Sequence, residues 1–337
     1  IPDILNTVLS ILPYPVETRL VNEYPQLDLQ IQYGETHYDF IKRLMEEVGI
    51  SYHFEHKAGS HTLVLSDNLG SYKPMDSVAY QNCFVYPPDL KLMEEYVSQF
   101  EPTQTHTTGA IRLNDFQFKT PTADLTVAAN QPWQTAHNTL EKYEWHQGDY
   151  LDPNSGGNKA RIRMEELRQH GQRIIGAGNL RGMQTGHTFN LHNHPTEDAN
   201  RDWLMLATEY VIEEVSQETG SHQNFKVQVR FLVQPGNEQV RPDRLLKKPH
   251  APTQTATIVG PEGKEVWVDQ YGRVKIQFHW DMYGARDENS SCWVRVSNPW
   301  QGTNFGGVHH PRIGQEVIID FFVLSRQCLY FLLLKLI

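Results

Sequence analysis

Residues 266–280, VWVDQYGRVKIQFHW, constrain the fold more than any other segment because their side chains alternate between apolar and polar. A period of two places successive side chains on opposite faces of a β-strand. The apolar side chains of the second half share one face: Val274, Ile276, Phe278 and Trp280. The DQYGR segment between the two halves is typical of a turn, so we predict a β-hairpin.

The same period continues through residues 251–322, where WVRV and QEVIIDF indicate further strands. A segment with about five short strands and no helical period is typical of a small Greek-key barrel of the OB type. We therefore predict a separate OB-fold domain at residues 251–322.

Residues 1–75 carry different signals, namely two helices and a hairpin. Apolar residues at helical spacing predict a helix over residues 1–12 that ends at Pro13. Thr36 and Asp39 form a capping-box pattern ahead of a second apolar stripe, and Gly49 provides a stop signal. Residues 50–67 then alternate on both sides of a polar turn, which predicts a β-hairpin directly after the second helix.

Short strand-like runs such as AIRLNDFQF and NFKVQVRFLVQ dominate residues 92–248, with one charged helical stretch, KARIRMEELRQHG. They predict a β-barrel part with a helical insertion. The basic, proline-bearing RPDRLLKKPHAPT segment is typical of a linker. The predicted fold class is mainly β with some helices (α+β), and residues 1–250 form a first domain that consists of a helical and hairpin part (1–75) and the barrel part (92–248).

Composition narrows the possible functions. The net charge of −10, without a cluster of Lys and Arg, argues against a nucleic-acid surface, because such surfaces bind through concentrated positive charge. The three cysteines lie far apart without a CxxC pair: Cys83, Cys292 and Cys328. They indicate neither a disulfide framework nor a thiolate zinc site, and a reducing cytoplasm is the expected place of assembly.

Neither end of the chain carries a targeting signal. The first residues lack an initiator Met and a basic n-region, so we expect no signal peptide and a chain that begins partway into a longer protein. The apolar LYFLLLKLI near the C-terminus is far shorter than the ~20 residues of a membrane-spanning helix.

Three long segments carry a resemblance to a known family. Residues 263–321, from GKEVWVDQYGRVKIQFHW to GQEVIIDF, resemble the OB-domain signature of VgrG, the spike protein of type VI secretion. Upstream, LDLQIQYGETHYDFIKRLMEEVGISYHFEHKAGSHTLVLSD and IRLNDFQFKTPTADL resemble the hub region of the same family, which is similar to the baseplate hub of contractile phages. The likeness covers nearly the whole chain up to Phe321.

The resemblance implies a phage-tail-hub-like domain at residues 1–250, with its N-terminal barrel missing, followed by an OB-fold spike base at 251–322. It also implies a homotrimer whose barrels surround a threefold axis. Five residues are implied to lie in the OB core or in the axial trimer packing: Trp293, Pro311, Arg312, Gly314 and Glu316.

The implied function is mechanical. Such a protein caps the hexameric inner tube and is driven through a target membrane when the sheath contracts, so no enzymatic activity, catalytic residue, metal or cofactor is expected. Its other expected partners are effector or adaptor proteins. It is assembled in the bacterial cytoplasm on the secretion apparatus and then translocated out of the cell.

Residues 323–337, VLSRQCLYFLLLKLI, depart from the family, which continues at this point into a β-helix needle. A frame shift, a premature stop or an artefact of expression would each produce such a tail. We expect residues 1–322 to contain the base of the spike without its needle.

Chemical sites were weighed against structural roles. Two histidine groups could hold zinc with a nearby carboxylate: His187, His192 and His194 with Glu197, and His53, His56 and His61 around Glu55. Hydrogen-bonded polar surfaces are the favoured interpretation of both groups. The GAGNLRG run at 176–182 lacks the GxGxxG spacing and a βαβ unit, so it predicts glycine turns and not a phosphate site.

Three alternatives remain open at this stage. One is a carbohydrate- or nucleic-acid-binding OB module that uses its tryptophans for stacking. Another is a metal hydrolase, and the third is a phage or prophage baseplate hub. A stable trimer favours the spike or hub, ligand affinity favours the module, and stoichiometric zinc favours the hydrolase.

Overall fold

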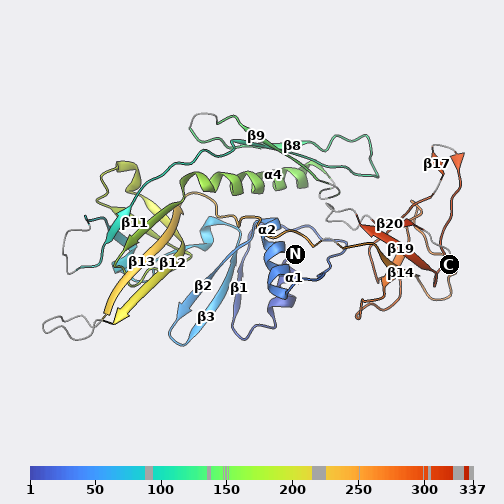
Figure 1. The fold of residues 1–337 in the computed structure, drawn as a ribbon, viewed down its shortest axis with the longest axis horizontal. Helices are drawn as coiled ribbons and strands as arrows, with labels where there is room; N and C mark the ends of the chain where they lie inside the picture. The colour runs from blue at the N-terminus through green and yellow to red at the C-terminus, as the bar shows by residue number, and fades with distance from the viewer. Residues whose placement is uncertain are drawn as a thin grey trace.

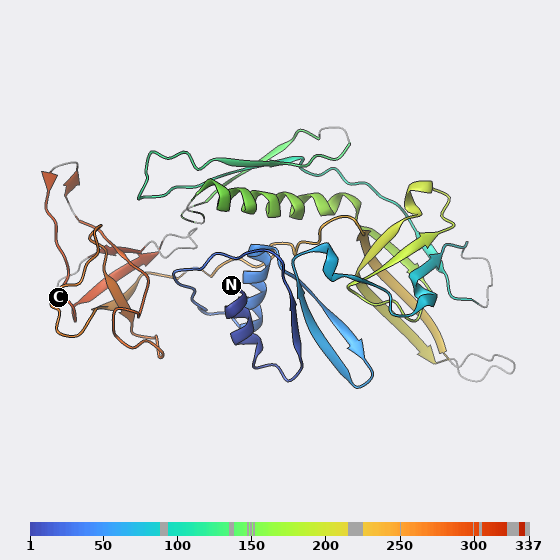
Figure 2. The same ribbon diagram turned by 180° about the vertical axis from the view of Figure 1, so that it is seen from behind.

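The computed structural model describes the chain except for residues 88–93, 135–137, 147, 149, 151, 215–224, 250, 299, 303–304, 322–329 and 334–337. A strand-rich barrel lies at one end of the long axis and the C-terminal unit at the other (Figure 1). Between them lies the N-terminal module, and helix α4 runs alongside that module in both views (Figure 2).

The N-terminal module packs two helices on a three-stranded sheet of order β1-β3-β2. Its elements are α1 (Pro2–Leu9), β1 (Val16–Arg19), α2 (His37–Val48), β2 (Ser51–Lys57) and β3 (Ser60–Ser66). The predicted capping box is confirmed, because the Thr36 hydroxyl accepts a hydrogen bond from the Asp39 backbone N–H at 3.1 Å. Gly49 ends α2 with φ 75°, a left-handed conformation that glycine adopts at little cost. The hairpin is also confirmed, whereas α1 ends three residues before the predicted boundary at residue 12.

A second, seven-stranded sheet curls around its own apolar core. Its elements are β4 (Lys73–Pro74), β5 (Asn82–Phe84), β6 (Val97–Phe100), β10 (Ile174–Gly178), β11 (His187–His192), β12 (Asp202–Glu214) and β13 (Phe225–Pro235), with the short helices η1 (Leu69–Ser71), α3 (Val78–Gln81), η2 (Gln169–Gln172) and η3 (Glu197–Ala199). A bridge between Val85 and Val97 joins the two ends of the sheet, which closes the barrel. Trp203 and Phe189 are fully buried inside it.

The predicted helical insertion is confirmed as α4 (Pro153–Arg168). The Asp152 side chain accepts hydrogen bonds from the backbone N–H groups of Asn154 and Ser155 and caps the helix. The same insertion contains a sheet of order β8-β7-β9, formed by β7 (Ala110–Asn114), β8 (Val127–Asn130) and β9 (Glu141–Trp145). Ile111 and Leu113 pack with Ala160 and Met164 in a core of their own, so α4 lies between this sheet and the N-terminal module.

The C-terminal unit contains a five-stranded sheet of order β15-β14-β19-β20-β16. Its elements are β14 (Gln254–Val259), β15 (Lys275–Phe278), β16 (Arg295–Val296), β17 (Gln301–Gly302), β18 (Phe305–Gly306), β19 (Glu316–Phe321) and β20 (Tyr330–Leu333). The mainly β class with some helices is confirmed, while the OB type of this unit and the domain boundaries stay predictions.

The predicted hairpin at 266–280 is only partly correct. A backbone hydrogen bond from Asp269 to Arg273 makes the expected turn, but residues 266–269 form no strand. Ile276 and Phe278 are buried as the alternation requires, whereas Trp280 is 46% exposed. The reason is that the chain turns after Phe278, so that the face defined by the alternation ends there.

Candidate functional site: the charged junction of the hub

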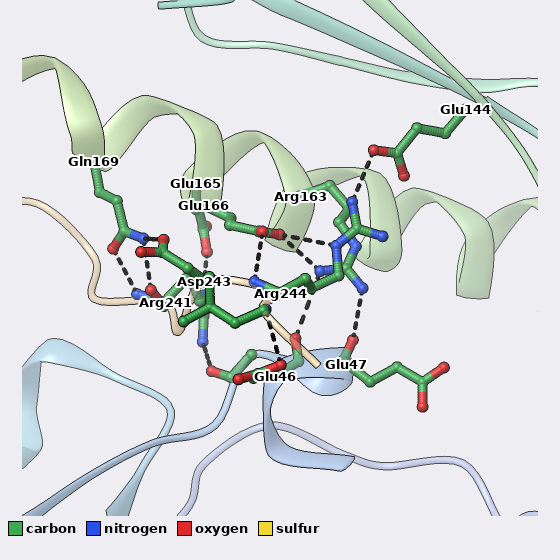
Figure 3. Close-up of polar contacts among 12 residues, drawn as sticks. Glu46, Glu47, Glu144, Arg163, Glu165, Glu166, Gln169, Arg241, Asp243 and Arg244 are labelled. Carbon is green, nitrogen blue, oxygen red and sulfur yellow. Dashed lines mark hydrogen bonds and ion pairs between the residues drawn. The ribbon is translucent and has the colours of Figure 1, made fainter. Parts of the chain in front are cut away.

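Two buried arginines join the N-terminal module to α4 and to the segment that follows the barrel. Arg241 is 2% exposed, and its guanidinium donates to the Gly49 and Asp67 carbonyl oxygens at 2.7 and 3.0 Å. It also pairs with the Glu165 carboxylate on α4 at 2.7 Å. One side chain therefore joins three segments that are far apart in sequence (Figure 3).

Arg163, also 2% exposed, makes an equivalent connection from α4 itself. Its guanidinium pairs with Glu166 at 2.7 Å and donates long hydrogen bonds, 3.5 and 3.3 Å, to the Glu46 and Glu47 carbonyl oxygens. These carbonyls belong to the last turn of α2, where backbone oxygens have no partner within the helix. A positive charge also interacts favourably with the negative end of the helix dipole. The junction therefore caps the C-terminus of α2.

The connection also holds the backbone of the segment after the barrel. The Gln169 amide accepts from the Arg241 N–H at 2.9 Å and donates to the Arg241 carbonyl at 2.6 Å. The Glu46 carboxylate accepts from the Leu245 and Leu246 N–H groups at 3.1 and 3.0 Å. We call Glu46, Arg163, Glu165, Glu166, Gln169, Arg241, Asp243 and Arg244 the hub junction (Figure 3).

Arg244 extends the hub junction to the inserted sheet. Its guanidinium lies 2.7 Å from Glu144 on β9 and 3.4 Å from Glu166 on α4. Burial raises the pKa of Glu144, but hydrogen bonds from His146, Arg244 and Lys142 outweigh burial and leave the pKa below its usual range. Burial lowers the pKa of Arg163. The lowered pKa keeps the Glu144 carboxylate ionised as a hydrogen-bond acceptor, so it is not poised to take up or release a proton near neutral pH.

A cavity of about 390 Å³ lies beside the hub junction. Its lining mixes cations with carboxylates: Arg43, Glu46, Glu47, Glu144, Trp145, His146, Lys159, Arg163, Arg244, Leu246 and Lys248. Across the described ranges, no three His, Cys, Asp or Glu side chains come together in a geometry that could hold a metal ion. Nor is any described helix both long and apolar enough to cross a lipid bilayer.

A second contact joins the inserted sheet to the C-terminal unit. The Phe118 ring, in the loop after β7, meets Tyr271 edge-on with ring centroids 5.6 Å apart. The guanidinium carbons of Arg295 and Arg273 lie 4.9 and 5.5 Å from the centroid of the same ring. Such cation–π contacts contribute roughly 0.5–1 kcal/mol each at partly exposed positions. We call Phe118, Tyr271, Arg273 and Arg295 the Phe118 contact.

The five site residues predicted from the sequence do not form one cluster of buried side chains. Pro311 is buried, and Trp293 is half-buried and stacks on Trp267 with centroids 6.4 Å apart. Arg312, Gly314 and Glu316 are exposed on the single chain. Their assignment to trimer packing stays a prediction.

His192, His194 and the glycine run have structural roles. His192 contacts the Asn82 amide at 3.0 Å, and His194 contacts the Phe100 carbonyl at 2.9 Å, so both rings have hydrogen-bond partners within the protein. In the glycine run, a Cβ on Gly178 would lie 2.4 Å from the Tyr96 carbonyl oxygen. This glycine allows close strand packing in the barrel wall, which agrees with a structural role.

Sequence reasoning missed the hub junction. The sequence predicts a linker at 241–253. Residues 241–249 and 251–253 do lack regular structure, but the side chains of Arg241 and Arg244 are anchored by ion pairs. The one available signal was three charged residues within 241–244, RPDR, next to a proline, and that signal is also common in solvated connections.

The sequence profile of the phage tail baseplate hub (GPD) family matches residues 1–216. The type VI secretion system spike protein VgrG1b of Pseudomonas aeruginosa is 37% identical over 326 residues, which are 95% of this chain and 44% of that protein. The spike protein VgrG1a of the same organism is 37% identical over 328 residues, 95% of this chain and 50% of that protein.

A third relative, the actin cross-linking toxin VgrG1 of Vibrio cholerae, is 31% identical over 94% of this chain but only 29% of its own length. Among solved structures, the Escherichia coli c3393 protein, a type VI secretion component similar to the T4 phage tail proteins gp27 and gp5, superposes with a TM-score of 0.62. It shares 17% identity and covers 98% of this chain and 70% of its own. The chain spans about half the length of the P. aeruginosa proteins.

Proposed function

Because the chain belongs to the phage tail baseplate hub (GPD) family and is related to the VgrG spike proteins, we propose that it is the rigid hub and spike base of a type VI secretion machine. In this role it acts as a homotrimer, caps the hexameric inner tube and transmits the thrust of sheath contraction. The observation that carries the proposal is the 37% sequence identity to VgrG spike proteins over 95% of the chain.

The hub junction supports a mechanical role. A protein that transmits force needs modules that cannot hinge, and relative motion is the default where contacts between domains are small and polar. Here the C-terminus of α2, the middle of α4 and the segment after the barrel share buried ion pairs and hydrogen bonds. The Phe118 contact extends the same connection to the C-terminal unit.

The proposed role needs neither a catalytic group nor a cofactor, and we propose that this segment is non-enzymatic. Its partners are two further copies of itself, the tube protein, and effectors or adaptors carried by the spike. Assembly takes place in the cytoplasm, and translocation then removes the spike from the cell. Membrane contact is limited to mechanical puncture.

The test is the oligomeric state combined with tube binding. Size exclusion coupled to light scattering should give three times the 38.9 kDa chain mass at micromolar concentration, and the trimer should retain the hexameric tube protein of the same machine on a column. A strictly monomeric chain that retains no tube protein would refute the proposal. Saturable binding of single-stranded nucleic acid or glycans by such a monomer would favour the OB-module alternative, and tube binding confined to a phage tail protein would favour a baseplate hub.

A further inference from the structure

His53 lies between the N-terminal module and the barrel. It is on β2, its side chain is 7% exposed, and its ring faces His187 on β11 with centroids 6.5 Å apart. Tyr72, which follows η1, lies 5.6 Å away by the same measure. Within the part of the chain that the structure describes, neither ring nitrogen of His53 has a hydrogen-bond partner.

Gly186 lets the His53 ring pack closely against the backbone. Its φ is 74°, and a Cβ built on it would lie 2.2 Å from the Cδ2 atom of His53, so the ring rests against the bare backbone. The Gly186 N–H already donates to the Met205 carbonyl at 2.9 Å. Because neither ring nitrogen has a hydrogen-bond partner among the described residues, protonation would bring an unpaired charge into this contact, and burying an unpaired charge is costly.

The charged groups around the His53 ring do not offset the cost of protonating it. Glu55 is on the same strand, but its carboxylate already pairs with Arg19 of β1 at 2.7 Å and Lys73 of β4 at 3.4 Å. Hydrogen bonding and charge from Arg19, with help from Lys73, lower the pKa of Glu55 to about 2. Its charge therefore stays constant over the range in which His53 titrates.

We propose that His53 is an acid-sensitive latch: in its neutral form β2 packs on the turn before β11, and its protonation opens this contact between the N-terminal module and the barrel. This device goes beyond the spike role and does not depend on it. A chain that is rigid near neutral pH would loosen at this contact in an acidic compartment.

The direction of the pH effect follows from the difference between the pKa of His53 in the closed form and in the opened form. Burial lowers the pKa of His53 to about 4, with Glu55 opposing the shift and His187, Arg19 and Lys73 adding to it. The opened form, with an ordinary pKa near 6.5, binds the proton more tightly, so the contact is at full strength above about pH 6.5 and weakens as the pH falls towards 4. With these two pKa values, the opening equilibrium constant is about 30-fold larger at pH 5 than at pH 7.5.

Hydrogen exchange of the full chain tests the latch, with rates corrected for the intrinsic effect of pH. Amides of β2 and of residues 186–187 should show the ~30-fold increase in opening at pH 5, and amides of α4 serve as the internal reference for global loss of stability. His53→Phe keeps a flat ring without a titrating group and should remove the increase. His61→Gln, on the exposed part of the same hairpin, should retain it.

Two results would overturn the latch: equal opening of these amides at both pH values in the unmodified protein, or the full increase in His53→Phe. Should His53→Phe not fold, His53→Gln replaces it with the same expectation. Neither result bears on trimer formation or tube binding, which are measured at neutral pH.

Discussion

Replacing Arg241 by methionine tests whether the hub junction holds the modules together. Arg241→Met keeps the length of the side chain but removes the donors to the Gly49 and Asp67 carbonyls and the partner of Glu165. Removal of one member of a buried ion pair costs about 3–5 kcal/mol; here the Gly49 carbonyl loses its Arg241 donor and Glu165 loses its buried partner, although it keeps the exposed Arg161. For 337 residues unfolding as one unit, an entropy of roughly 0.7 kcal/mol per kelvin converts this cost into a fall in Tm of about 4–7 °C.

Arg161→Met is the matched control, since Arg161 pairs with the same Glu165 carboxylate at 2.8 Å but is 38% exposed. An exposed pair four residues apart on a helix contributes about 0.3–0.5 kcal/mol, so the control should lose less than about 1 °C. Scanning calorimetry measures both variants. Equal shifts, or an Arg241→Met shift below about 1 °C, would refute the assignment of Arg241 as the residue that ties the modules together.

Two further predictions concern the other contacts. Phe118→Ala removes about 2 kcal/mol of ring contacts, so proteases should cleave the 241–253 connection faster. Phe116→Ala, in the same loop, should leave the cleavage rate unchanged. Equal cleavage rates in the two variants would show that the Phe118 contact does not restrain the C-terminal unit. Gly178→Ala should lower Tm, because its Cβ would lie 2.4 Å from a backbone oxygen and overpacking costs about 1–3 kcal/mol. Gly157 lies in α4 with open space beside it. Gly157→Ala should raise Tm instead, because alanine is favoured over glycine in a helix by about 0.5–1 kcal/mol. A Tm shift of the same sign in both variants would contradict the packing argument.

Elements with local signals were predictable from the sequence. Helix α2 carries its own start and stop, Thr36 with Asp39 and then Gly49, and the structure uses all three. The β2–β3 hairpin and the insertion helix α4 were likewise readable from their periods. In each case the residues that decide the element lie within about one or two turns of one another, so no knowledge of the tertiary fold was needed.

The closing of the barrel and the hub junction could not be predicted in this way. Strands β4 and β5 are two and three residues long, too short to show a period, and they pair in parallel with β11, more than 100 residues later. Arg241 bonds to a carbonyl 192 residues earlier in the chain. A charged residue in a proline-bearing segment is usually solvated, and only the fold reveals that this one is buried.

The placement of charge inside the hub junction fits the force-bearing role that we propose. Apolar packing contributes stability but little orientational specificity, so a purely apolar interface between modules could slide or repack. A buried ion pair adds little net stability, yet it penalises every arrangement in which the charge loses its partner. Arg163 of α4 bonds to two carbonyls in the last turn of α2, and Arg241 bonds to the Gly49 carbonyl that follows and to Glu165 of α4. A small displacement of α4 therefore breaks several bonds at once. The hub junction therefore specifies one relative arrangement of the modules, which is what the proposed mechanical role requires.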